Sequence, residues 1–212
     1  MEIKDHPTLY TSTSREDATN LIEYDSSGYN NHGTCSAVFK HTSDAPRYKN
    51  CKNFENNKYI NCGRGAMVTD ALTISCWTQA NNWSTFDGQL ISCTDTGGWG
   101  LGYGANKDGH GFEVFCNNDY HGINLNYNSL SSGWHHIAAT YNGNTIIGYI
   151  DGQPIASKSG LPGKLTYNSS NCLMIGAEPG GTTPSGNYFT GKISDVRIYA
   201  TALSAAAVKE LY

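Results

Sequence analysis

Two turn-forming dipeptides, Asn142-Gly143 and Asp151-Gly152, separate short runs of strand-forming residues. Asn-Gly and Asp-Gly supply the positive φ angles that tight two-residue turns need. Residues 134–158 therefore predict three consecutive antiparallel strands. This meander makes an antiparallel β fold the starting point for the whole chain.

Turn residues recur at similar spacing after residue 33, and each group of Gly, Asn, Asp or Pro bounds another short strand signal. This spacing predicts two packed antiparallel sheets. Ser204 begins the one helical pattern, 204–212, which we expect to close the sandwich. The predicted strands are 34–40, 58–62, 72–79, 89–93, 99–103, 111–116, 122–126, 134–141, 145–150, 153–158, 172–177 and 188–199.

Composition narrows the class of protein further. Only 15% of the residues are charged, which excludes coiled coils and long helical bundles, and the 24 glycines and 14 tyrosines are typical of an all-β protein. The net charge of −4 comes without a basic patch, so we expect no nucleic-acid partner. Apolar runs such as 173–175 are far shorter than the roughly 20 residues of a membrane helix, so we expect no membrane insertion.

The seven cysteines are an odd number without a Cys-x-x-Cys pair, which argues against a complete disulfide framework and a zinc ribbon. We expect reduced thiols in the core. The N-terminus lacks the pattern of a signal peptide, so we predict folding in a cytoplasm, before residence on a virion or a bacterial surface. We predict one sandwich domain over 21–212, preceded by a polar lead-in over 1–20.

Several segments together resemble the laminin-G-like or concanavalin-A-like jelly-roll domains of bacterial surface proteins, lectins and phage tail proteins. The resemblance covers residues 25–212 and implies an all-β, two-sheet antiparallel jelly roll with a short C-terminal helix. Each segment is short, but their order along the chain is specific. The segments are 25–34, 54–60, 72–77, 133–143, 148–152, 191–199 and 202–204.

The resemblance also implies a structural calcium, with side-chain ligands from Asp25 and Asp195. Carboxylate, amide and backbone oxygens are the hard donors that calcium prefers. The alternative is that Asp25 and Ser26 cap a turn while Asp195 bonds Arg197 or a loop. The predicted metal residues are Asp25, Gly28, Asn30, His32 and Asp195.

Sequence patterns for catalysis are missing. Glycosidases need two carboxylates that flank the scissile bond, whereas Glu113 is the sole acid in its predicted strand. The chain also lacks a Gly-x-Ser-x-Gly elbow. We therefore predict that the protein is not an enzyme. A hydrolase whose residues converge from distant positions is the minor alternative.

Aromatic and amide side chains are concentrated in residues 81–128, the combination that stacks on sugar rings and bonds their hydroxyls. Trp83, in a turn-like run, is the best candidate for an exposed platform. Trp99 follows glycines, and either approaches a ligand or fills the core. We expect Asp119, Tyr120 and His121 to lie in a loop at the rim. The predicted ligand residues are Trp83, Trp99, Tyr103, Asp119, Tyr120 and His121.

Two functions follow from these patterns. The first is a non-catalytic, lectin-like adhesion module of a phage or bacterial surface assembly, whose partner is a glycan or surface polysaccharide. The second is a structural or protein-interaction domain of a virion or tail, whose loops contact other virion or cell-surface chains.

Overall fold

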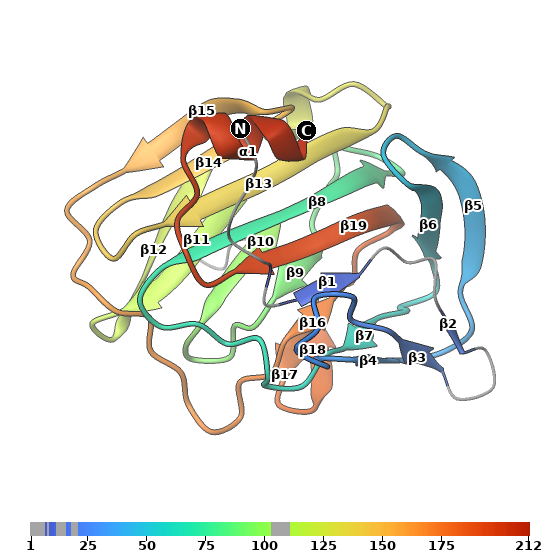
Figure 1. The fold of residues 1–212 in the computed structure, drawn as a ribbon, viewed down its shortest axis with the longest axis horizontal. Helices are drawn as coiled ribbons and strands as arrows, with labels where there is room; N and C mark the ends of the chain where they lie inside the picture. The colour runs from blue at the N-terminus through green and yellow to red at the C-terminus, as the bar shows by residue number, and fades with distance from the viewer. Residues whose placement is uncertain (1–6, 8, 12–15, 18–20, 103–110) are drawn as a thin grey trace.

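The computed structural model describes residues 7, 9–11, 16–17, 21–102 and 111–212. It confirms the predicted fold: two antiparallel sheets pack face to face, and one short helix lies against the outside of the first sheet (Figure 1). None of the helices in these described ranges is long and apolar enough to cross a membrane.

The first sheet contains the predicted meander at one end. Its strands, in spatial order, are β15 (Gln153–Lys158), β14 (Ile146–Ile150), β13 (His135–Tyr141), β8 (Leu72–Ala80), β19 (Gly191–Tyr199), β6 (Lys49–Phe54) and β5 (Lys40–Ala45), with β1 (Leu9–Thr11) paired to β19.

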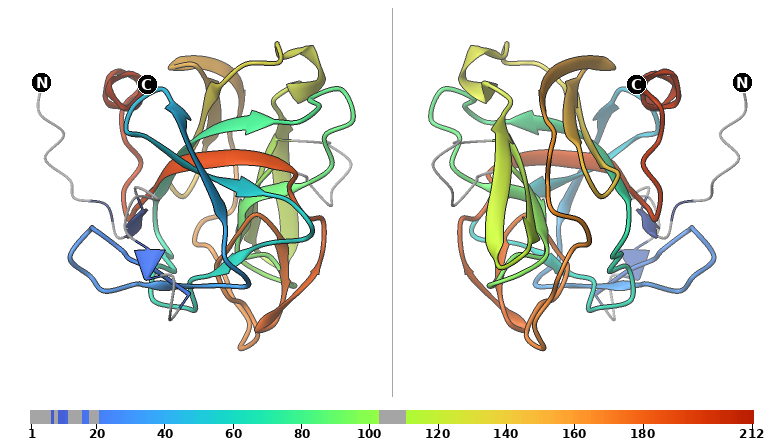
Figure 2. Two further views of the ribbon diagram at one scale, coloured as in Figure 1. Left: turned by 90° about the vertical axis from the view of Figure 1, so that its right-hand side faces the viewer. Right: turned by 90° about the vertical axis from the view of Figure 1, so that its left-hand side faces the viewer.

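In Figure 1, one part of the second sheet lies behind the first sheet and the other part lies below it. Its strands, in spatial order, are β12 (Asp119–Asn124), β11 (Gly111–Cys116), β10 (Trp99–Gly102), β9 (Gln89–Ser92), β16 (Met174–Ile175), β7 (Ile60–Asn61), β4 (Gly33–Cys35), β3 (Ile22–Glu23) and β2 (Glu16–Asp17). The hairpin of β17 (Glu178–Gly180) and β18 (Thr183–Gly186) lies below it, and the single-turn helix η1 (Tyr127–Ser129) follows β12 (Figure 2).

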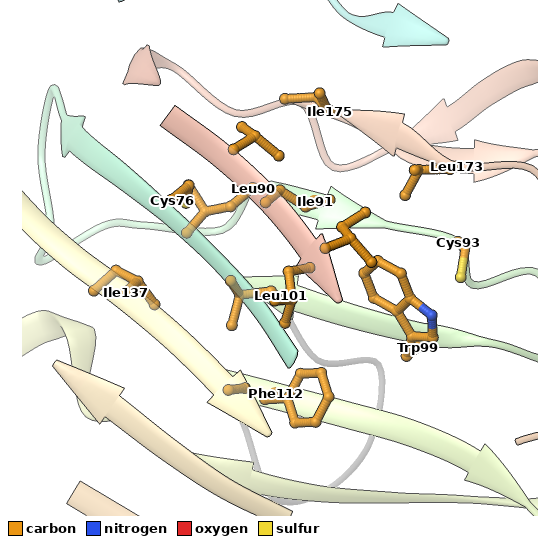
Figure 3. Close-up of a cluster of buried hydrophobic side chains, with 14 of the residues drawn as sticks. Cys76, Leu90, Ile91, Cys93, Trp99, Leu101, Phe112, Ile137, Leu173 and Ile175 are labelled. Atoms are coloured by element: carbon orange, nitrogen blue, oxygen red, sulfur yellow. The ribbon is translucent and has the colours of Figure 1, made fainter. Parts of the chain in front are cut away.

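The core lies between the sheets, where side chains from alternating strand positions meet (Figure 3). Cys76 and Ile137 of the first sheet are fully buried with Leu101 and Phe112 of the second. All seven cysteines are buried, as expected, and none is bonded to another. Burial raises the pKa of the Cys76 thiol, as it does for other cysteines in the core.

The helix α1 (Ala205–Leu211) begins one residue after the predicted N-cap. The Ser204 side chain accepts a hydrogen bond from the Ala207 backbone N–H, at 3.2 Å. Val208 and Leu211 bury the apolar side of the helix against the outer face of the first sheet. The Arg47 guanidinium donates hydrogen bonds to the carbonyl oxygens of Glu210 and Leu211. These bonds supply donors for carbonyl groups that have no partner within the helix.

The N-terminal segment contributes a strand to each sheet within its described residues. β1 pairs with the second half of β19, from Val196 to Ile198, whereas β6 pairs with the first half of β19. Leu9 in β1 is fully buried in the core. The expected polar lead-in over 1–20 thus includes residues that pack with the sandwich.

Candidate functional site

The loop 81–88 joins β8 to β9 at one end of the sandwich, and it turns its aromatic residues inward. Asn82 Oδ1 accepts from the Ser84 backbone N–H at 3.0 Å and from the Ser84 hydroxyl at 2.7 Å. This turn leaves Trp83 only 4% exposed, with its ring packed against Phe86 and Tyr127. The prediction of Trp83 as an exposed platform is therefore wrong, because the Asn82 turn directs the indole to the core.

One edge of this aromatic cluster still borders a hollow of about 160 Å³ on the surface. Three elements meet there: the loop 81–88, the end of β12 and η1. Asn126 has a left-handed backbone and donates its N–H to Asn124 Oδ1 at 2.7 Å, which turns the chain from β12 into η1. The lining residues are Trp83, Ser84, Phe86, Asn124, Asn126, Tyr127 and Asn128.

A second hollow, of about 260 Å³, adjoins the same loop, and Phe86 lines both hollows. Of the described residues that line the two hollows, Asp87 alone has an acidic or basic side chain. Amides, hydroxyls and aromatic rings supply most of the rest. The second lining consists of Ala80, Asn81, Asn82, Thr85, Phe86, Asp87, Gly88 and Thr190.

The indole N–H of Trp83 is buried and has no acceptor among the described residues. Leaving a buried donor unpaired costs about 1–3 kcal/mol. Trp83 lines the hollow with other atoms, because its indole nitrogen is inaccessible to solvent.

The other predicted aromatic residues are not brought to these hollows. Trp99 is fully buried in the core, where its indole N–H donates to the Tyr167 hydroxyl at 3.1 Å (Figure 3). The core alternative for Trp99 is therefore correct, and the ligand alternative is wrong. Tyr103 lies outside the described residues.

Asp119, Tyr120 and His121 lie in β12, so their predicted loop location is wrong. Asn117 and Asn118 both have positive φ and form the tight turn that starts the strand three residues earlier than predicted. The Tyr120 hydroxyl bonds the backbone of Gly97, and its ring packs against Phe115. At about 3.3 Å per residue, Tyr120 lies about 13 Å along the strand from Asn124 and the first hollow.

Asp25 serves as the capping residue of its own loop. Its carboxylate accepts from the Ser27 N–H and hydroxyl, at 2.9 and 2.7 Å, and from the Asn31 N–H at 2.9 Å. His32 Nδ1 accepts from the Asp25 backbone N–H at 3.0 Å. This is the turn-capping alternative, with Ser27 in the place expected for Ser26. Gly28 and Asn30 have the positive φ angles that the loop requires.

Asp195 does not fit the predicted calcium site. It lies at a bulge of β19 with a φ of 50°, where the strand changes its pairing. Arg197 donates to both carboxylate oxygens, at 2.8 and 3.1 Å, and Arg47 is 3.9 Å away. Two positive charges at this carboxylate oppose a cation. Within the described ranges, no group of three or more His, Cys, Asp or Glu residues is arranged to hold a metal ion.

Comparisons with known proteins agree with this fold. A family model described as "Concanavalin A-like lectin/glucanases superfamily" matches residues 54–209. An adhesion G-protein coupled receptor V1 of Danio rerio is 27% identical over 120 residues, which cover 49% of this chain but 2% of the receptor. The chain therefore spans a small fraction of that curated relative.

Two groups of solved structures resemble the whole chain. Domain 4 of the extracellular arabinanase AbnA from Geobacillus stearothermophilus, solved with arabinotriose, superimposes with a TM-score of 0.75 at 16% identity and covers 98% of both chains. The receptor-binding domain of botulinum neurotoxin mosaic serotype C/D gives 0.70 at 18% identity, over 100% of this chain and 51% of that one. The ligand-binding domain of serotype D, solved with N-acetylneuraminic acid, gives 0.64 at 16% identity, over 98% and 50%.

Proposed function

Because this chain belongs to the concanavalin A-like lectin/glucanases superfamily, we propose that it is a carbohydrate-binding module. The observation that carries the proposal is the pair of adjoining hollows beside the loop 81–88, lined by amides, hydroxyls and aromatic rings. Sugar hydroxyls need such donors and acceptors, and the ring C–H groups need apolar contact. Arabinotriose and N-acetylneuraminic acid, bound in the two solved neighbours, give the ligand class a precedent.

The sugar chain that these hollows fit is neutral. A sialic acid or uronic acid carries a carboxylate, which proteins recognise with Arg or Lys. Among the described residues, neither hollow is lined by a basic side chain, and Asp87 would repel an anion. Two hollows that share Phe86 can seat two parts of the same sugar chain, so we propose an uncharged oligosaccharide as the ligand.

The wider setting belongs to the proposal as well. A module of this kind would attach a phage or bacterial assembly to a glycan surface. A calcium at the 25–32 loop stays a prediction; with Asp195 paired to Arg197, the loop would have to hold it through Asp25 and backbone oxygens.

A glycan array with neutral and acidic oligosaccharides, read with and without calcium, tests the function. We expect neutral chains to bind, and Asn128→Ala and Asn81→Ala to weaken binding about tenfold each, the value of one good hydrogen bond. These two exposed amides line different hollows, and neither side chain has a hydrogen-bond partner among the described residues. Gln153→Ala removes an exposed amide on β15 and should leave binding unchanged.

If the protein binds no glycan on the array, this result would contradict the carbohydrate function and favour a structural or protein-interaction domain. Binding that survives both Asn variants would place the glycan elsewhere on the surface. Equal binding of acidic and neutral chains would contradict the neutral specificity alone.

A further inference from the structure

Three side chains beside the loop 81–88 form a continuous hydrogen-bonded chain. The Ser131 hydroxyl lies 3.1 Å from His135 Nε2, and His135 Nδ1 lies 2.8 Å from Asp151 Oδ2. The serine is in the segment between η1 and β13, the histidine is the first residue of β13, and the aspartate is in the turn between β14 and β15. The order is that of a nucleophile, a base and an orienting carboxylate.

The hydrogen bonds around Asp151 define the protonation of the imidazole. Asp151 Oδ1 accepts from the His136 backbone N–H at 2.9 Å, which holds the other oxygen toward His135. An ionised carboxylate only accepts, so Nδ1 donates to Asp151; in the neutral imidazole with this tautomer, Nε2 accepts from the Ser131 hydroxyl. The Ser131 carbonyl oxygen lies 3.2 Å from Nε2, where it would stabilise an imidazolium after proton transfer.

The exposure of the side chains suits such a relay, because the base is buried and the nucleophile is exposed. The His135 side chain is only 11% exposed and packs edge-on against Trp83, with the ring centroids 5.9 Å apart. Ser131 is exposed. The backbone N–H groups of Ser132 and Gly133 have no acceptor among the described residues. The N–H that follows a nucleophilic serine is a common donor to the oxyanion of acyl transfer.

Against the prediction of a non-catalytic protein, and in line with the minor alternative of a hydrolase whose residues converge in space, we propose that Ser131 is a nucleophile toward carboxylic esters. Its oxygen attacks the ester carbonyl while His135 Nε2 takes the hydroxyl proton, and the oxyanion lies near the Ser132 N–H. The C–O bond to the alcohol breaks, and His135 returns the proton to the leaving oxygen. Water then attacks the acyl-serine with His135 as base, and it releases the carboxylic acid and restores Ser131. Asp151 acts as a positioning residue.

The substrate that this location fits is an O-acylated sugar, a step that rests on the proposed function. Trp83 contacts His135 on one side and lines the first hollow on the other. Asn128, which also lines that hollow, lies three residues before Ser131 in the sequence. An ester carried by a sugar in the hollow would extend past Trp83 and Asn128 to the serine.

Two reagents test the chemistry without any glycan: a fluorophosphonate, whose adduct is located by mass spectrometry, and p-nitrophenyl acetate. We expect one adduct on Ser131 and ester hydrolysis above the buffer rate. Ser131→Ala should abolish the adduct and lower the hydrolysis rate at least tenfold. Asp151→Asn keeps an acceptor for the His136 N–H and should lower the labelling rate at least tenfold.

Ser157→Ala, at an exposed serine on β15 away from the proposed site, is the matched control and should label as the unaltered protein does. A rate that survives Ser131→Ala, or the absence of an adduct in a folded protein with an unchanged Tm, would overturn the proposal and leave the chain of bonds structural. The adduct and the hydrolysis rate are both measured without a glycan. If only glycan binding is absent, the sugar-ester substrate alone is overturned.

Discussion

Burial decides which aromatic side chains of the sandwich reach the surface. Trp83 and Trp99 have the same residue type and similar glycine- and asparagine-rich surroundings in the sequence, yet only Trp83 borders a surface hollow. Trp99 instead lies between the sheets with a satisfied N–H. Sequence identifies an aromatic residue, but the direction of its ring depends on which turn precedes it, and Asn82 determines that direction for Trp83.

His136 provides a prediction at this scale. Burial lowers its pKa from 6.5 to about 3, and the Arg197 and Arg47 charges act in the same direction, against the opposing effect of Asp151. The folded protein therefore keeps His136 neutral while the unfolded chain binds a proton below pH 6.5. His136 therefore lowers the free energy of unfolding by about 1.4 kcal/mol for each unit by which the pH falls between 6.5 and 3. Above pH 6.5 the penalty is absent.

We expect His136→Phe to become more stable relative to the unaltered protein as the pH falls from 7 to 4, measured by urea unfolding at each pH. The exposed His41→Gln is the control and should show a flatter difference. A constant difference between His136→Phe and the unaltered protein across this range would show that His136 titrates normally.

At the scale of elements, short polar segments determine where the chain turns. The meander of β13, β14 and β15 follows the sequence prediction closely, because Asn-Gly and Asp-Gly turns are local signals. β5 and β6 were not predicted, because their polar residues lack a clear alternation. The bulge at Asp195 was missed for a related reason: it depends on Arg197 and on two different neighbours of β19.

The loop 25–32 gives a prediction for an element. Asp25→Ala removes three hydrogen bonds from the loop, and we expect it to lower the free energy of unfolding by about 1–2 kcal/mol in metal-free buffer. Ser26→Ala alters an exposed neighbour and should change the free energy of unfolding by less than about 0.5 kcal/mol.

Thermal unfolding in chelator and in calcium measures both variants. No loss of stability for Asp25→Ala in metal-free buffer would show that the three bonds do not stabilise the loop. A calcium-dependent rise in Tm that Asp25→Ala abolishes would establish the predicted calcium site.

At the scale of the molecule, a buried ion pair joins the two sheets. Glu23 belongs to the second sheet and Lys52 to the first, and their charged atoms lie 3.0 Å apart with side chains no more than 1% exposed. The Lys52 ammonium also lies over the Phe39 ring. Such a pair adds little net stability, but removal of one partner leaves a buried charge.

We expect Lys52→Met to lower the free energy of unfolding by about 3–5 kcal/mol, and the double variant Glu23→Leu, Lys52→Met to recover a large part of that loss. Lys192→Met breaks the exposed pair with Asp44 and should cost less than about 1 kcal/mol. Urea unfolding of the four proteins measures these differences. A double variant no more stable than Lys52→Met would show that the loss comes from packing instead of charge.

The sequence by itself determined the all-β class, the meander, the C-terminal helix and the family resemblance, because turn dipeptides, period-two patterns and helix caps act between near neighbours. The tertiary structure decided which aromatic residues reach a surface, which carboxylates bind arginine or cap a loop, and where Ser131, His135 and Asp151 meet. These outcomes depend on packing between strands that are distant in the chain, which no local pattern encodes.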